Sequence, residues 1–335
     1  MLRKIKLLVG FSALQGVVQL ASAASGFILV RVLDIREFAA YTVATSLLTV
    51  LNLLTDSGIG TGLNVIGGRV WQTRDALSRL VATAFSYRTF LARYAVPLGV
   101  VFSQGLFWQN KIPWGTSISL TFLTIATMWG TWQISIYAVP LRLHGRYFPI
   151  QRAELAGSIL RLLLLGIVGC LFINSVIAIV TMLGALAFQA FLMRNEAKSV
   201  VDLGAVLDPG YRLELSGLVK KQAFQVFFFA FQGQLTIWLI SIFGSVEKVA
   251  ELGALGRISV LFAIVGSVIT NLVSPTFARC ESLPRLAKLT AAALGGYGLL
   301  GCLLMLICLK FPLQVLWLIG PKYSGLTREL PWVMI

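Results

Sequence analysis

Long apolar runs, separated by short breaks that carry the charged residues, dominate this chain. A helix that crosses the hydrocarbon core of a membrane needs about 20 consecutive apolar residues. The runs have this length and fall at 7–30, 38–64, 80–107, 117–139, 150–172, 176–193, 218–243, 249–273 and 286–309, and another begins near residue 330. The pattern predicts an all-α, polytopic membrane protein with about nine to ten transmembrane helices.

Composition supports this class and narrows the chemistry. Hydrophobic residues make up 57% of the chain and charged residues 12%, against about 45–50% and about 25% in soluble domains. The four cysteines show no CxxC spacing, and the one histidine, His144, lies in a basic loop. We therefore expect no metal and no cofactor. The chain has no GxxxxGK[ST] motif, so we do not expect it to hydrolyse nucleotide.

The first apolar run has two interpretations. Basic residues precede it and small residues follow near 21–25, as in a secretory signal with a cleavage site. However, the run continues to residue 30, which is longer than the apolar core of a signal peptide, about 7–15 residues. We expect an uncleaved first helix.

A polar stretch with mixed charge divides the chain. It covers 194–216 and contains the turn signal Asp208-Pro209-Gly210. Residues 35–39 also resemble 246–250 at an offset that places a helix, a tight charged loop and another helix on both sides. The predicted organisation is an N-terminal six-helix lobe at 1–193, a cytoplasmic linker at 194–216 and a partial C-terminal lobe at 217–335.

Lysine and arginine are distributed unevenly between the loops. They gather before the first run and near 69–79, 142–152, 194–221 and 279–288, whereas the alternate loops hold few. Cytoplasmic loops of membrane proteins carry this excess. The N-terminus is therefore predicted to be cytoplasmic.

One face of the second run carries polar side chains. Thr42, Thr45, Thr49, Asn52 and Asp56 follow one another at spacings of three and four, so they share a helix face. A water-filled cavity would explain this stripe. The alternative is that the threonines bond back to their own helix and Asp56 caps its end.

Ionisable residues at helix depth are costly in lipid, by at least about 2.5–3.5 kcal/mol at the bilayer centre, unless they face water or a partner. Arg161 and Arg257 are predicted to face a cavity. Glu154 shares a helix face with Arg161 and could instead neutralise it. Arg88 could extend to the cytoplasmic surface.

Two glutamines, Gln225 and Gln232, lie on one side of a strongly aromatic segment and are further candidate binding residues. Basic groups outnumber acidic ones within the runs, and guanidinium groups suit phosphate oxygens. We therefore expect an anionic substrate. There are two alternatives: the chain could export an organic cation, or it could be a membrane-embedded enzyme of polysaccharide assembly.

Several short segments resemble bacterial polysaccharide transporters of the Wzx type. These are RVLDIREFAAY at 31–41 with LLTDSGIG at 53–60, and 246–252, 274–279 and 319–323. This family belongs to the MATE-like MOP superfamily, with the multidrug extruders. Ala39 and Ala250 stand where the family often has glycine. Since the family usually has twelve to fourteen helices, the C-terminal lobe is expected to be incomplete.

The resemblance implies a MATE-like pair of helical lobes that exposes a central cavity alternately to each side of a bacterial inner membrane. The implied function is that of a flippase, not an enzyme, which moves undecaprenyl-diphosphate-linked oligosaccharide to the periplasmic leaflet. Membrane lipids and polysaccharide polymerase or ligase machinery are the implied partners, and nucleic acid is not. The candidate substrate-binding residues are Arg161, Arg257, Asp56, Asn52, Thr45, Glu154, Gln225 and Gln232.

Overall fold

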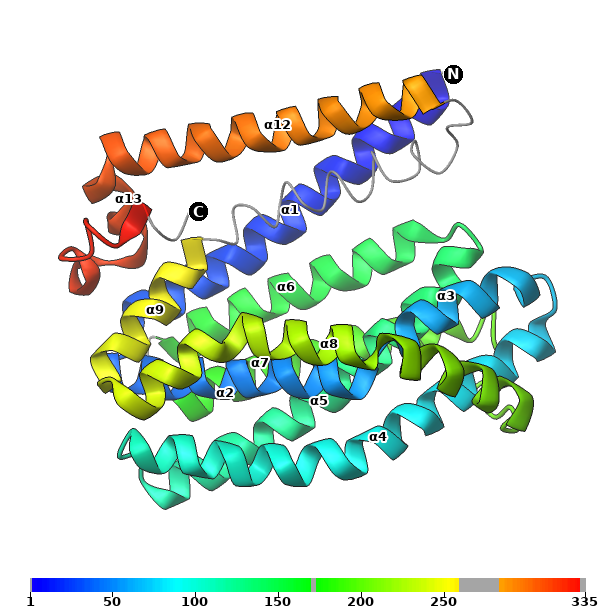
Figure 1. Ribbon diagram of the computed structural model, residues 1–335, viewed down its shortest axis with the longest axis horizontal. Coiled ribbons are helices and arrows are strands. Elements are labelled where there is room, and N and C mark those ends of the chain that lie inside the picture. Colours follow the sequence, from blue (N-terminus) through cyan, green and yellow to red (C-terminus); the bar gives the residue numbers. More distant parts are fainter. Residues whose placement is uncertain (1, 170–172, 259–282, 332–335) are drawn as a thin grey trace. The chain divides into compact units, whose positions relative to one another are not determined.

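The structure is a computed structural model that describes residues 2–169, 173–258 and 283–331. Its regular elements in these ranges are helices, which confirms the all-α prediction (Figure 1). The helices form two compact units, one of Asp34–Ala250 and one of Met1–Leu33 with Glu251–Ile335.

The unit Asp34–Ala250 is a bundle of helices. It contains α2 (Ile35–Asp56), α3 (Ile59–Val70), α4 (Arg74–Gln109), α5 (Trp114–Leu143), α6 (Tyr147–Gly169), α7 (Ser175–Ala197), α8 (Pro209–Phe243) and the start of α9 (Val246–Ile258). α5 packs against α7, and α2 packs against α4, α5 and α8. Figure 1 shows α8 running beside α2. The central position of α2 explains why most of its residues are buried.

Helix ends in this unit follow local sequence signals. Asn174 precedes α7, and its side chain accepts a hydrogen bond from the amide of Ile177 at 2.9 Å. Asp208 precedes α8 and accepts from the amide of Gly210 at 2.8 Å, with Pro209 at the first helical position. Such caps satisfy amide groups that have no partner within the helix.

The predicted helix at 38–64 is two helices. α2 ends where Ser57 and Gly58 adopt left-handed conformations, with φ of 41° and 93°. A side chain at Gly58 would also meet the Gln222 side chain of α8. The break therefore has both a conformational and a packing reason. Apolar periodicity alone did not show it, because α3 continues the apolar run.

Helices extend into both ends of the predicted linker 194–216. α7 continues to Ala197, and α8 begins at Pro209, so only 198–208 are outside helices. α8, predicted to open the second lobe, packs against α2, α3 and α4 within the unit Asp34–Ala250. The contact units and the predicted lobes divide the chain at different places, and the lobe boundaries stay a prediction.

Several helices can cross a membrane. In the described residues, Leu14–Val32 of α1 (Leu2–Val32), α2, α4, α7 and α8 have the necessary length and hydropathy. α12 (Leu283–Lys310) and α13 (Pro312–Ile319), which bend by 94° at their junction, could add one span. α5 is also long, but it does not meet the same hydropathy requirement, and it carries three serines and five threonines. Residues 259–273 of one predicted helix, and 332–335 at the start of another, lie outside the described residues.

In the other unit, the ends of α1 and α13 are joined by two basic side chains. The Arg31 guanidinium donates to the carbonyl oxygens of Trp317 and Leu318, and stacks over the Trp317 ring at 4.3 Å. In return, Lys322 Nζ donates to the carbonyl oxygen of Leu33 at 2.8 Å. Gly320, with φ of 104°, ends α13 and brings Lys322 into place. Each helix end thus receives a cation near carbonyl groups that lack helical partners.

Candidate functional site

An ion pair that includes a buried arginine lies at the junction of α2, α4 and α5. Arg88 is 3% exposed, and its Nη1 lies 3.5 Å from Asp56 Oδ1. The same nitrogen donates to Ser135 Oγ at 2.7 Å, and the guanidinium lies over the Trp132 ring at 5.2 Å. Arg88 therefore does not extend to a surface within this unit. Asp56, with a third of its side chain exposed, supplies the opposite charge that makes burial tolerable.

Neutral groups extend this ion pair into a network. Thr131 Oγ1 donates to Asn52 Oδ1 at 2.7 Å, which joins α5 to α2. Arg88 Nη2 lies 3.4 Å from the Asn52 carbonyl oxygen. Within the described ranges, Arg88 Nε and Trp132 Nε1 are buried without a hydrogen-bond partner. The arrangement is polar and incompletely satisfied, as in sites where another group can bind or rearrange.

The polar stripe on α2 has two parts, and a different interpretation applies to each. Thr42 donates to the Phe38 carbonyl oxygen at 2.8 Å, Thr45 to that of Tyr41 at 3.0 Å and Thr49 to that of Thr45 at 2.9 Å. These threonines bond to their own helix, as in the alternative interpretation. The other half of the stripe, Asn52 and Asp56, contacts neighbouring helices.

Asp56 has a second contact that the sequence suggested. Its carboxylate lies 3.3 Å from the amide nitrogen of Gly60, in the first turn of α3. The residue thus caps the helix that follows the break as well as pairing with Arg88. Capping and ion pairing do not compete here, because a carboxylate has two oxygens and several acceptor positions.

Arg161 contacts α2 from α6. Its Nη2 donates to the hydroxyl oxygen of Tyr41 at 2.9 Å, and Tyr41 is 1% exposed. Arg161 Nε is buried and, in the residues that are described, has no hydrogen-bond partner. Glu154 is half-buried and lies about two helical turns before Arg161, on the same face of α6. Arg161 therefore has a neutral aromatic partner that the sequence did not indicate.

The remaining predicted binding residues lie elsewhere. Gln225 and Gln232 are exposed on α8. Arg257 belongs to the other unit, on α9, where a side chain at Gly26 of α1 would contact its Cδ at 3.3 Å. The structure thus brings Asn52 and Asp56 together around Arg88. It does not bring Gln225 or Gln232 into that network.

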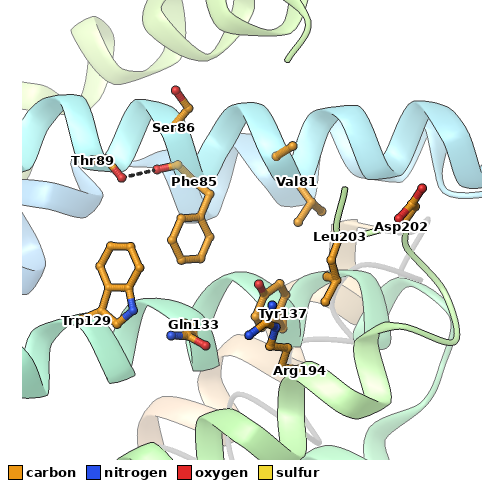
Figure 2. A pocket seen from close by; sticks show the side chains of 11 residues that line it. Val81, Phe85, Ser86, Thr89, Trp129, Gln133, Tyr137, Arg194, Asp202 and Leu203 are labelled. Atoms are coloured by element: carbon orange, nitrogen blue, oxygen red, sulfur yellow. Dashed lines mark hydrogen bonds between the residues drawn. The ribbon is translucent and has the colours of Figure 1, made fainter. Parts of the chain in front are cut away.

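A separate pocket of about 430 Å³ lies between α4, α5 and the segment that follows α7. Aromatic and hydroxyl side chains form much of its wall, and Arg194 and Asp202 supply charges (Figure 2). The lining residues are Val81, Ala82, Phe85, Ser86, Thr89, Trp129, Gln133, Tyr137, Arg194, Asp202 and Leu203. No candidate from the sequence lines it, because its residues come from α4, α5, the end of α7 and the segment after α7, which share no motif.

Two hydroxyl groups hold the wall of this pocket in place. The backbone amide of Asp202 donates to Ser78 Oγ at 2.7 Å, and that of Asp208 donates to Thr83 Oγ1 at 2.9 Å. Both hydroxyls lie on α4. The segment 198–208 is therefore fixed along α4 although it is not helical.

A known structure shares the fold of this chain. It is described as the inward-facing conformation of a multidrug resistance MATE family transporter of the MOP superfamily. The TM-score is 0.73 at 14% sequence identity, and the match covers 95% of this chain and 76% of that one. No family model and no curated protein matches the sequence. The fold is thus that of a MATE transporter of the MOP superfamily, which confirms the predicted fold class.

Proposed function

We propose that this chain is a membrane transporter of lipid-linked oligosaccharide. In this proposal it moves undecaprenyl-diphosphate-linked oligosaccharide from the cytoplasmic to the periplasmic leaflet of a bacterial inner membrane, by alternating access. The observation that carries the transport part is the MATE fold over 95% of the chain. A fold by itself does not define a substrate, because the side chains of the binding site determine which substrate binds.

Arg161 provides the main support for an anionic substrate. It is partly buried at helix depth, and its partner is the uncharged Tyr41 hydroxyl. Arg88, by contrast, pairs with Asp56 and has much of its charge balanced. A guanidinium that keeps its charge within the bundle can bind a diphosphate by paired hydrogen bonds.

Export of multidrug-type compounds is the second candidate function. The structural neighbour is described as a multidrug resistance transporter. The pocket lined by Phe85, Trp129 and Tyr137, with Asp202 at its rim, also suits an aromatic cation. Both functions need the same fold, so only a substrate assay separates them.

Orientation and partners belong to the same proposal. The basic loops favour a cytoplasmic N-terminus, which would place His144 in the cytoplasm and Lys111 in the periplasm. A membrane-impermeant thiol reagent applied to intact cells should then label Lys111→Cys and not His144→Cys. Polymerase or ligase machinery would receive the oligosaccharide on the periplasmic side.

The test of function compares substitutions in a strain that lacks the gene. Arg161→Ala should reach the membrane at a normal level and fail to restore surface polysaccharide, and Arg161→Lys should restore it only in part. Arg257→Ala should also fail. Arg93, which is exposed on α4, is the matched control, and Arg93→Ala should restore polysaccharide fully.

The same strains separate the two candidate functions. Full polysaccharide with Arg161→Ala and Arg257→Ala would contradict binding of the diphosphate by these side chains. If deletion leaves polysaccharide unchanged but makes cells sensitive to cationic dyes, the multidrug function replaces the oligosaccharide function.

A further inference from the structure

The pocket between α4, α5 and 198–208 is separate from the Asp56–Arg88 network and has the chemistry of an amphipathic ligand site. We propose that it binds a membrane phospholipid with a zwitterionic head group of the phosphatidylethanolamine type. Its volume of about 430 Å³ falls in the range of ligand pockets, about 300–1,000 Å³. The proposal does not depend on the diphosphate contacts assigned to Arg161 and Arg257, and it is an alternative to binding of an aromatic cation in this pocket.

Aromatic rings form the apolar part. Phe85 of α4 meets Trp129 of α5 edge to face, with ring centroids 5.4 Å apart, and lies 6.2 Å from the Tyr137 ring. Trp129 is nevertheless 47% exposed. An exposed indole beside other rings offers a surface for the first methylene groups of an acyl chain, and such residues gather where membrane meets water.

Opposite charges form the polar part. Arg194 in the last turn of α7 and Asp202 in the following segment are both exposed and line the same pocket. In the part of the chain that is described, no hydrogen bond or ion pair engages the Arg194 guanidinium. Arginine suits a phosphate, and a carboxylate suits an ammonium group. A head group that carries both charges matches this pair, whereas a purely anionic one would be repelled by Asp202.

The polar end is fixed rather than loose. The amide of Asp202 is held by Ser78 Oγ at 2.7 Å, and its carboxylate accepts from the Gly204 amide at 3.0 Å. A charge that is already positioned loses little freedom on binding. Figure 2 shows Trp129 and Phe85 at one end of the pocket and Asp202 at the other, with Tyr137 and Arg194 between them.

The position along the helices also suits a lipid. The pocket extends from Thr89 of α4 to Asp202, outside the helices, so it reaches from helix depth to the helix ends. Basic loops, which are typical of the cytoplasmic surface, mark this end of the bundle. A lipid seated there would join α4 and α5 to the segment after α7.

The experiment measures lipid binding to the purified full chain in detergent by native mass spectrometry. Dioleoyl phosphatidylethanolamine is the probe, and dioleoyl phosphatidylglycerol is the anionic comparison. Wild type should prefer the zwitterionic lipid. Arg194→Ala should weaken its binding about tenfold, since a charge-assisted contact is lost. Arg152, exposed and near the Phe148 ring outside the pocket, is the matched control, and Arg152→Ala should bind as wild type does.

Asp202→Asn tests the head-group assignment separately. It should weaken phosphatidylethanolamine binding and strengthen phosphatidylglycerol binding, each several-fold, because the repulsion is removed. Trp129→Ala should weaken both lipids, and Trp129→Leu serves if the alanine variant does not fold. Equal binding by wild type, Arg194→Ala and the Trp129 variant would overturn the site. An unchanged lipid preference in Asp202→Asn would overturn the zwitterionic assignment.

Discussion

Arg88 and Arg31 show two ways in which a helical membrane protein accommodates an arginine. Arg88 is buried within the unit Asp34–Ala250, and the opposite charge of Asp56 balances it. Arg31 is exposed at the end of α1, in the other unit, where it contacts carbonyl groups and the Trp317 ring. The first position depends on a specific charged partner, whereas the second uses partial charges that every helix end provides.

This difference predicts that the two sites respond unequally to substitution. Removing one member of a buried ion pair leaves the other charge without compensation, which costs about 3–5 kcal/mol when both groups are fully buried. Cations at helix C-termini contribute about 0.3–1 kcal/mol.

Asp56→Asn should cause the largest loss. Because Asp56 is one third exposed, we expect a decrease in the free energy of unfolding of about 2–3 kcal/mol, below the fully buried value. The measurement is reversible unfolding in mixed detergent micelles. Asp75→Asn is the matched control, since the Asp75–Arg79 pair is exposed on both sides, and it should change stability by less than about 1 kcal/mol.

A double variant tests whether Asp56 and Arg88 stabilise the protein as a pair. In Asp56→Asn combined with Arg88→Leu, no charge remains buried, so most of the lost stability should return. If the double variant is as unstable as the sum of both single variants, the two residues do not act as a pair.

Tyr41→Phe tests an intermediate case, in which an arginine meets a neutral partner. Arg161 loses its contact with the Tyr41 hydroxyl, and hydrogen bonds to charged groups contribute about 1.5–3 kcal/mol. We expect a loss near the lower value, about 1.5 kcal/mol, since a neutral acceptor attracts the guanidinium less than a carboxylate does. Tyr94→Phe, at an exposed tyrosine of α4, should have no measurable effect. A loss as large as that of Asp56→Asn would contradict this ranking.

Arg31→Ala and Lys322→Ala should each lower stability by about 0.5–1 kcal/mol. In Arg31→Ala, backbone amides near the end of α13 should exchange their hydrogens faster than in wild type. Arg328, exposed in the same unit, is the control, and Arg328→Ala should leave exchange unchanged. Exchange that is identical in Arg31→Ala and Arg328→Ala would show that the contact with Trp317 and Leu318 does not stabilise the helix end.

The sequence was sufficient for most helices in the described residues, because membrane burial imposes a strong apolar pattern on them. It also placed Asn52 and Asp56 on one face of α2, which follows from helical geometry. It did not identify Arg88 as the partner of Asp56, since 32 residues separate them and the pairing depends on how α4 packs against α2. The break at Ser57 and the pocket beside 198–208 were missed for a related reason. Both depend on contacts between segments that are distant in the sequence.

The smallest expected effect concerns threonines that bond to their own helix. Thr45 Oγ1 donates to the Tyr41 carbonyl oxygen, whereas Thr131 Oγ1 reaches from α5 to Asn52 Oδ1 on α2. Valine has nearly the same shape and lacks the hydroxyl, so it removes only the hydrogen bond. Thr45→Val should change the free energy of unfolding by less than about 0.5 kcal/mol, because a bond within one helix adds little to packing. Thr131→Val should cost about 1 kcal/mol, in the range of hydrogen bonds between membrane helices.

Transport measured on the same two variants decides the meaning of the α2 stripe. If Thr45 only bonds to its own helix, Thr45→Val should restore surface polysaccharide as well as wild type does. Loss of transport in Thr45→Val at unchanged stability would instead show that the substrate path includes Thr45, and the cavity interpretation would then extend beyond Asn52 and Asp56. Equal costs for Thr45→Val and Thr131→Val would remove the distinction between contacts within a helix and contacts between helices, on which this prediction rests.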